Sequence, residues 1–499
     1  MLALLAFVPI LLVLLLMLVF RWGSAQAGLA GWCCEILVAL LAFGLNWQVF
    51  WVSQVKGLLL TLNVLVILWP ATFLYNAVDQ IGGIQAIAHA LETMVRQKGW
   101  LLILQAWMLS TILESITGFG LPIAIVAPLM MALGVSPVMA VTAVSVGHTW
   151  ASSTGGMALS LRTLAEITHY PTETLYPDSA ILLGLSLILT GFAVAFLLGE
   201  GQHWWRVLIV GSVAAAAHYF LGVWGLISIS ALLSSTIGFG VGVLLNPISG
   251  NGHGKITRSP ALWSGLIAYG VLVVIILVVS LLPSLNQVLS QFTWTLQFPS
   301  VTTATGLVTP AESGYLFHIF THPGTLIIIT IVFTLLIFRL RSSIPNPDMS
   351  KLLGITARSA TPASVGTLTM IGLAVAMEHT GMTTVLANGL RALVGGIYPL
   401  FTPIVGVIGS FATGSNLNSN VLFGVLQKEV AGLINASPVV LLAAQTTGAS
   451  LGSMIAPAKL AVGTSTSDVK GREGEVLRYT LPICLGIALL VGVAALIMG

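Results

Sequence analysis

Charge is what this sequence most lacks. Its 499 residues include 18 Lys and Arg plus 15 Asp and Glu, which makes 33 charged residues. They are 7% of the chain, whereas an ordinary soluble domain has about 25%. A soluble fold of this length could not cover its surface with so few charges. The net charge of +3 is too small and too scattered for a nucleic-acid-binding protein, so both classes are excluded.

Cysteine is scarce as well. Cys33, Cys34 and Cys484 all lie in apolar stretches, which excludes a disulfide framework. The sequence has no HExxH, CxxC or Walker motif, and its acidic residues are too dispersed for a metal cage. We therefore expect neither a bound metal nor a cofactor.

Apolar residues, by contrast, make up 57% of the chain. Runs of about 18 or more apolar residues are typical of membrane helices. Twelve such runs lie near residues 2–20, 29–46, 57–78, 137–160, 180–198, 207–222, 223–245, 261–282, 324–338, 361–378, 437–462 and 479–498. The sequence therefore predicts an all-α, polytopic protein that spans a lipid bilayer as one integral membrane domain, residues 1–499.

Two further apolar regions, 101–133 and 398–432, have a different pattern. Each consists of two short apolar arms around a polar, glycine-containing centre, residues 114–120 and 413–420. A helical arm of about 12 residues rises only about 18 Å, which is less than the hydrocarbon thickness of about 30 Å. We therefore expect two re-entrant hairpins, whose non-helical tips line a cavity near mid-membrane.

The positive-inside rule gives this layout an orientation. If both hairpins return to their side of origin and the N-terminus lies outside, only Lys56, Arg162 and Arg391 fall in outside loops. The inside loops then hold Arg21, Arg96, Lys98, Arg206, Lys255, Arg258, Arg339, Arg341, Lys351, Arg358, Lys470, Arg472 and Arg478. The bias predicts that both termini are outside and that segment 283–323, which has no Lys or Arg, is outside too.

An internal repeat follows the two hairpins. A Ser-Pro-Val triplet occurs at 136–138 and at 437–439, and a glycine follows each proline by ten residues, at Gly147 and Gly448. Both glycines lie in polar patches of small residues, and 448 minus 147 gives an offset of 301 residues. The predicted repeats cover about 57–222 and 324–498. Because the hairpins enter from opposite sides, the repeats are inverted, as in many secondary transporters.

The four polar patches predict a binding site for an anion. A helix broken at mid-membrane exposes backbone N–H groups and a positive dipole end, while hydroxyls and amides supply further contacts. Close packing of small residues between helices is the simpler alternative for each patch. The candidate substrate-binding residues are Thr117, Gly118, Ser152, Ser153, Thr154, Ser415, Asn416, Asn420, Thr446 and Thr447.

Titratable residues within the membrane are further candidates. A carboxyl group at low dielectric favours its protonated form, so Glu114 at the first hairpin tip is a candidate for proton coupling. His148 is a second candidate, with a simple packing role as its alternative. Lys459 could pair with the substrate carboxylate or with Glu114, or extend to the inside interface.

At these residues the chain resembles the L-lactate permease family. The resembling stretches are 113–124, 411–416 with 419–420, 446–448, 454–457 and 469–474. The resemblance implies proton symport of L-lactate, D-lactate, glycolate and related 2-hydroxymonocarboxylates across the bacterial cytoplasmic membrane. It also implies a remoter similarity to the ion-transporter superfamily, whose paired hairpins belong to a mobile domain.

The chain departs from this family at two positions. Asn416 stands where some lactate permeases have an acidic residue, and the typical Gly-Ala-Ala-Gly-Phe-Gly tract is here Ser-Ile-Thr-Gly-Phe-Gly at 115–120. The alternatives to proton symport are Na⁺-coupled carboxylate transport, a channel and an intramembrane hydrolase that uses His148 with a serine. The sequence does not determine the oligomeric state.

Overall fold

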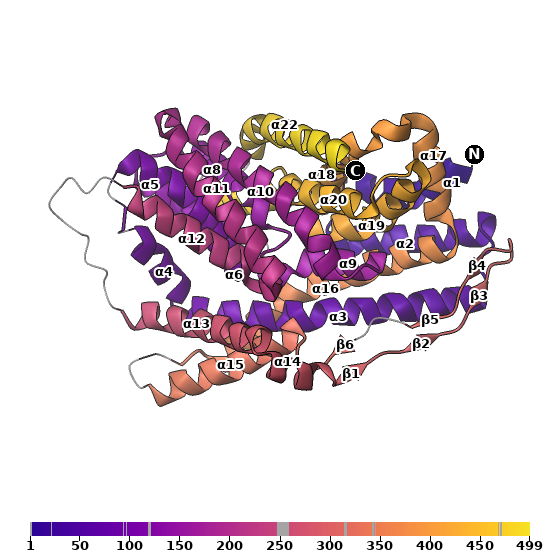
Figure 1. Cartoon of the computed structure of the whole chain (residues 1–499), viewed down its shortest axis with the longest axis horizontal. Coiled ribbons are helices and arrows are strands. Elements are labelled where there is room, and N and C mark those ends of the chain that lie inside the picture. The colour runs from indigo at the N-terminus through magenta and orange to yellow at the C-terminus, as the bar shows by residue number, and fades with distance from the viewer. Residues whose placement is uncertain are drawn as a thin grey trace.

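The computed structural model describes residues 2–20, 22–92, 94–95, 97–117, 121–246, 259–313, 317–341, 344, 346–467, 469 and 472–499. The molecule is elongated, and α3, α13 and α15 run along its length (Figure 1). The described part of the chain is almost entirely helical, which confirms the predicted all-α membrane fold.

The described residues of the first half of the chain form twelve α-helices and several short 3₁₀ or π turns. The helices are α1 (Leu2–Leu18), α2 (Ser24–Ala42), α3 (Trp47–Gln80), α4 (Gly83–Glu92), α5 (Lys98–Leu104), α6 (Ser110–Thr117), α7 (Leu121–Ala132), α8 (Pro137–Gly147), α9 (Leu159–Thr168), α10 (Thr172–Leu197), α11 (Trp204–Leu221) and α12 (Ser230–Leu244). The turns are η1 (Gln105–Leu109), η2 (Thr149–Ala151), η3 (Gly156–Ala158), η4 (Gly201–His203), η5 (Gly222–Leu226) and η6 (Ile227–Ile229).

The described residues of the second half form the remaining helices and six two-residue strands. The helices are α13 (Pro260–Leu281), α14 (Pro283–Ser290), α15 (Pro323–Leu340), α16 (Met349–His379), α17 (Met382–Val394), η7 (Gly395–Leu400), α18 (Thr402–Thr413), α19 (Asn416–Ile434), α20 (Pro438–Gly452), α21 (Pro457–Thr466) and α22 (Glu473–Met498). The strands are β1 (Thr293–Trp294), β2 (Gln297–Phe298), β3 (Val301–Thr302), β4 (Val308–Thr309), β5 (Glu312–Ser313) and β6 (Phe317–His318).

The helices long enough to cross a membrane differ in number from the twelve expected. Among the described residues ten stretches qualify by length and apolar character, or eleven if the bent pair Met382–Leu400 and Thr402–Thr413 is one span. The stretch Gly201–Leu244 combines two predicted spans, but its halves fold back on each other. A Cβ on Gly238 of α12 would lie 3.0 Å from the Cβ of Ala214 on α11.

Two spans that were expected to be continuous are broken. In the region 137–160, α8 ends at Gly147 and α9 begins only at Leu159. In the region 437–462, α20 ends at Gly452 and α21 begins at Pro457. The physical reason is local, because Pro457 lacks the N–H that a continuous helix needs and residues 156–158 take up left-handed backbone angles.

The two predicted hairpin regions each fold back on themselves. In the first, the ends meet, since a Cβ on Gly134 would lie 3.6 Å from Nζ of Lys98. In the second, the Ser419 hydroxyl of α19 donates to the carbonyl of Gly406 on α18 at 2.8 Å. Glycine allows each hairpin to pack on the helix after it. A Cβ on Gly147 would lie 1.9 Å from the carbonyl oxygen of Ala106, and one on Gly448 2.0 Å from that of Pro403.

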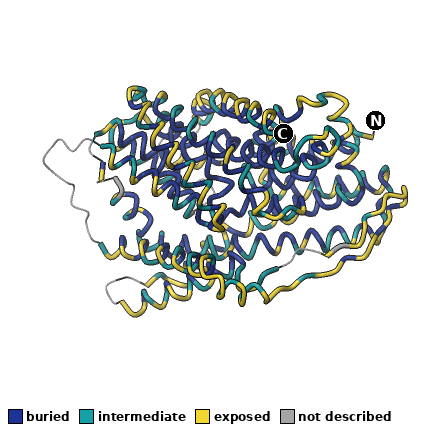
Figure 2. Tube along the Cα trace, in the orientation of Figure 1, coloured by how far each residue is buried: buried dark blue, intermediate teal, exposed yellow. Residues whose placement is uncertain are grey.

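The hairpins and broken helices lie at the centre of the molecule. Stretches Lys98–Ile116 and Pro438–Thr466 have hydrophobic windows that are 89% and 94% buried, against 39% for Pro323–Leu340. Figure 2 shows the same contrast between the buried centre and the exposed α13 and α15. The polar patches predicted from the sequence therefore lie in the most buried part of the fold.

Helices α3 and α16 cross the molecule side by side in opposite directions. A Cβ on Gly57 of α3 would lie 3.3 Å from Cα of Gly372 on α16. Further along, Asn76 of α3 donates to the hydroxyl of Thr356, near the start of α16, at 3.1 Å. Residues with higher numbers on α3 thus contact residues with lower numbers on α16, so the two helices are antiparallel.

Segment 283–323, which the sequence left without secondary structure, contains α14 and one long β-hairpin. The strand pairs β1–β6, β2–β5 and β3–β4 are all antiparallel. The hairpin tip docks on the loop between α2 and α3, where the Ala304 N–H donates to the Gly44 carbonyl at 2.8 Å. Asn46 of that loop donates to the Thr302 carbonyl at 2.7 Å. Glu312 lies on β5 and His318 on β6.

Candidate functional site

Four polar segments meet at the centre of the fold. They are the first hairpin tip at the end of α6, the break 148–158, the second hairpin tip at 414–416, and the break 453–456. The first break lies directly against the first hairpin tip, since a Cβ on Gly155 would be in van der Waals contact with Cα of Ser115, at 3.4 Å. The residues predicted from sequence fall mostly on these four segments.

Glu114 and Lys459 form a buried ion pair. Nζ of Lys459 lies 3.9 Å from Oε1 of Glu114, and the two residues are only 7% and 3% exposed. Glu114 belongs to α6, whereas Lys459 lies in the first turn of α21, after the second break. The lysine therefore points into the centre and does not extend to an interface.

Ser152 connects all four segments. Its hydroxyl donates to Oε1 of Glu114 at 3.4 Å and lies 3.3 Å from the hydroxyl of Ser453. Its carbonyl accepts from Nδ2 of Asn416 at 2.7 Å, which ties the second hairpin tip to the first break. Ser152 and Ser453 are 301 residues apart, the same offset as the two Ser-Pro-Val triplets, so equivalent residues of the two sequence repeats touch here.

A second buried network lies beside this one. The Thr446 hydroxyl donates to the Ser153 hydroxyl at 2.8 Å, and Nδ2 of Asn420 donates to the Thr446 hydroxyl at 2.8 Å. Ser153 also lies 2.7 Å from the hydroxyl of Ser450, and Asn420 donates to Ser160 at 3.1 Å. In the part of the chain that the structure describes, Oδ1 of Asn420 is buried without a hydrogen-bond partner.

Other predicted residues have different surroundings. The Thr447 hydroxyl donates to Ala443 of its own helix at 2.8 Å and adds nothing to the network. The Ser415 hydroxyl caps α19 by accepting from the Asn418 N–H. Nδ1 of His148 lies 2.6 Å from the Val144 carbonyl. Gly118 and the side chain of Thr117 lie outside the described residues.

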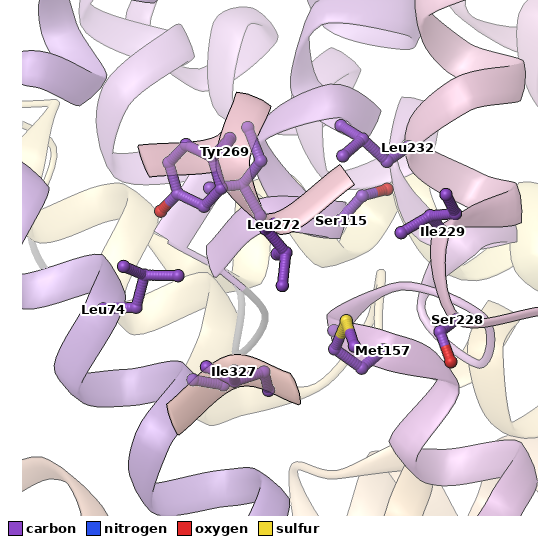
Figure 3. A pocket seen from close by; sticks show the side chains of 12 residues that line it. Leu74, Ser115, Met157, Ser228, Ile229, Leu232, Tyr269, Leu272 and Ile327 are labelled. Carbon is purple, nitrogen blue, oxygen red and sulfur yellow. The ribbon is translucent and has the colours of Figure 1, made fainter. Parts of the chain in front are cut away.

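The first break has a strained backbone. Gly156, Met157 and Ala158 have φ angles of 53°, 66° and 59°, a region that residues with a Cβ seldom adopt. A cavity of about 20 Å³ lies between this turn and the first hairpin tip (Figure 3). Its walls are mainly apolar and include Tyr269 and Leu272 of α13. The cavity is about large enough for one water molecule, so it is too small to hold a carboxylate substrate.

A family model described as L-lactate permease matches residues 2–499. The chain belongs to the L-lactate permease family. An L-lactate permease of Streptococcus iniae is 28% identical over 450 residues, which cover 87% of this chain and 92% of that protein. The glycolate permease GlcA of Escherichia coli is 25% identical over 99% of this chain and 95% of its own length. The YdaH transporter of Alcanivorax borkumensis is similar at 14% identity with a TM-score of 0.48, over 87% and 84% of the two chains.

This member of the L-lactate permease family contains one central residue that the sequence analysis missed. His218 of α11 is fully buried, and its Nε2 lies 3.4 Å from the hydroxyl of the predicted site residue Thr154. Tyr176 of α10 donates to the His218 carbonyl at 2.6 Å. The available signal was a lone ionisable residue inside an apolar run, which is a functional candidate by default.

Proposed function

We propose that this protein is a secondary transporter that carries L-lactate, D-lactate, glycolate and similar 2-hydroxymonocarboxylates together with a proton across the bacterial cytoplasmic membrane. The names of the L-lactate and glycolate permeases among its relatives support the substrate class. The observation that carries proton coupling is the buried pair of Glu114 and Lys459, at the point where both hairpins and both breaks converge.

The pair offers a direct way to couple the transport of the substrate to that of a proton. A substrate carboxylate that binds Lys459 competes with Glu114 for the same ammonium. Glu114, released from Lys459, is the group that carries the proton in this proposal. One anion and one proton enter together, so the cargo is neutral, and Ser152 and Asn416 remain to contact the substrate.

We further propose that the chain moves by alternating access between two inverted repeats. The order of a long helix, a short helix, a hairpin, a broken helix and a long helix occurs at α3–α10 and again at α16–α22. The first helices of these sets, α3 and α16, run antiparallel. Contact between Ser152 and Ser453 is what an axis relating the repeats would produce. Rocking or sliding of the hairpins would open the site to either side.

The deciding experiment measures L-lactate uptake into proteoliposomes that contain Glu114→Gln. We expect this variant to exchange lactate across the membrane but to lose accumulation driven by a pH gradient, because the amide cannot carry the proton. The matched control is Glu35→Gln, since Glu35 is a fully buried glutamate on α2. Normal proton-driven accumulation in the Glu114 variant would refute the assignment, and equal loss in both variants would show that the effect is not specific to Glu114.

The alternatives have their own outcomes in the same assay. Uptake that stops when choline replaces Na⁺ would show Na⁺ coupling in place of proton coupling. A hydrolase would consume the labelled acid without moving it. Residues 448–452 read Gly-Ala-Ser-Leu-Gly, a Gly-x-Ser-x-Gly pattern, but they lie within helix α20. A nucleophilic serine of that motif needs a sharp turn from a strand to a helix, which argues against the hydrolase.

A further inference from the structure

A polar cavity of about 280 Å³ lies at the end of α9 that is remote from the first break. Its floor includes Lys56 of α3, His169 at the C-cap of α9, Glu378 of α16 and Lys428 of α19. Its roof consists of residues 307–310 from the β-hairpin. We call this cavity the Lys428 pocket.

The charges of the Lys428 pocket favour an anion. Two lysines and two histidines line it, but only one carboxylate, that of Glu378. Glu378 lies 3.9 Å from Nε2 of His169, and Nζ of Lys56 lies 3.5 Å from that same nitrogen. Two further carboxylates are near the walls: Glu429 accepts from Thr384, and Glu166 accepts from Asn63 of α3.

Lys428 is a cation of this pocket that none of these three carboxylates pairs with. Its ammonium lies 5.8 Å from the centre of the Tyr170 ring, and no carboxylate of the described residues pairs with it. Glu429 is the next residue on the same helix, and side chains one position apart on a helix do not face each other. The pocket therefore presents an unpaired ammonium on one wall and a second, 4%-exposed ammonium at Lys56 on another.

The roof limits what can enter. The described roof residues, Leu307, Val308, Thr309 and Pro310, carry no charge. The tip is held at two places, because it bonds to the Gly44 loop and Leu307 packs on Gly381, where a Cβ would lie 2.9 Å from its side chain. The volume equals that of several water molecules at about 30 Å³ each, which suits a small organic acid.

We propose that the Lys428 pocket is a second binding site, which holds the carboxylate of a small monocarboxylate on its way to Glu114 and Lys459. This proposal rests on the transport function proposed above. The 10 residues of α9 separate the pocket from the first break by about 15 Å at 1.5 Å per residue. The pocket would raise the local concentration of the anion one helix length from the central site. Clefts lined by charges of one sign have this effect on substrates of the opposite charge.

The test uses a thiol at the roof as a charge sensor. Val308 is 59% exposed, so Val308→Cys is introduced together with Cys33→Ser and Cys34→Ser in the purified full-length protein. The rate of modification is compared for an anionic and a cationic methanethiosulfonate. We expect the anionic reagent to be favoured, and the preference to fall about tenfold in Lys428→Glu, because the charge reversal acts oppositely on the two reagents. Lys428→Gln should give an intermediate value and serves if the reversal impairs folding.

The control is Arg391→Glu, an exposed charge reversal on α17 that does not line the pocket. An unchanged preference in Lys428→Glu, or an equal fall in Arg391→Glu, would overturn the proposal. L-lactate should slow modification by the anionic reagent, and chloride at the same ionic strength should not. Equal slowing by chloride would overturn the assignment to a carboxylate. If the unaltered protein carries no lactate, the proposed function fails, while the labelling still decides whether the pocket attracts anions.

Discussion

At the scale of single residues, this protein satisfies its buried polar groups with one another. Ser153, Thr446 and Asn420 are all fully buried and share their hydrogen bonds. An unpaired polar group in such surroundings costs about 1–3 kcal/mol, so the network fixes how the second hairpin sits on the first break. The central site is therefore also part of what holds the two predicted repeats together.

Thr446→Val tests this dual role. The substitution keeps the shape of the side chain but leaves Nδ2 of Asn420 without one acceptor and Ser153 without one donor. We expect the free energy of unfolding to fall by about 1–3 kcal/mol, and lactate uptake to fall with it. Thermal unfolding in detergent measures the first effect and proteoliposome uptake the second.

Thr447→Val is the matched control, one residue further along α20. Its hydroxyl bonds only to the Ala443 carbonyl of its own helix, a bond that a helix tolerates losing. Equal losses of stability in the two variants would show that the network between hairpin and break contributes no more to stability than one hydrogen bond within a helix.

Sequence reasoning named most residues of the candidate site, but it did not predict which of them contact each other. Glu114 and Lys459 were both candidates because charge inside a membrane is costly, but their pairing depends on two breaks that bring segments 345 positions apart together. Thr447 was included because it adjoins Thr446, although neighbours on a helix point about 100° apart. His218 was missed because an isolated histidine in an apolar run has no neighbouring motif.

At the scale of elements, glycine determines how each hairpin meets the helix after it. Gly147 and Gly448 were singled out by their equal spacing from proline, and each abuts a backbone carbonyl of the preceding hairpin. The sequence could therefore predict that these positions matter. It could not predict that α8 ends at Gly147 and α20 at Gly452, because left-handed backbone angles such as those of Met157 and Ala158 are not encoded by local propensity.

Gly448→Ala should be strongly disruptive. The added methyl group would lie 2.0 Å from the Pro403 carbonyl, so α18 and α20 must separate, at a cost of about 1–3 kcal/mol or more. The control is Gly432→Ala in α19, where nothing lies within 4 Å of the new Cβ and alanine favours the helix by about 1 kcal/mol. Thermal unfolding and the monodisperse fraction in detergent distinguish the two. A Gly448 variant as stable as the Gly432 variant would show that the hairpin is not packed as described.

At the scale of the whole molecule, long apolar runs predicted the polytopic helical fold, because a helix that crosses a bilayer needs about 20 apolar residues. The long β-hairpin could not be predicted in this way. Its strand pairs are two residues long, and its position depends on bonds from Thr302 and Ala304 to a loop some 260 residues earlier. Such contacts leave no periodic signal in the sequence.

The same hairpin makes the orientation of the protein testable. Asn46, just before α3, bonds to the hairpin at Thr302, whereas Asn76, near the end of α3, bonds to Thr356. The 30 residues between Asn46 and Asn76 span about 45 Å at 1.5 Å per residue, more than the hydrocarbon thickness of about 30 Å. We therefore expect the hairpin tip, which lies at one end of α3 (Figure 1), and the start of α16 to be on opposite sides of the membrane.

The distribution of Lys and Arg predicts which of the two sides is cytoplasmic. Arg339 and Arg341 lie at the end of α15, and Lys351 and Arg358 near the start of α16. Segment 283–323 has no Lys or Arg, so we expect the hairpin outside. Ser300 and Ser350 are both exposed. In a background without Cys33 and Cys34, a membrane-impermeant thiol reagent should label Ser300→Cys in intact cells, and Ser350→Cys only after permeabilisation. The reverse pattern would invert the orientation and place the Lys428 pocket on the cytoplasmic side. Labelling of both in intact cells would contradict the spanning of the membrane by α3.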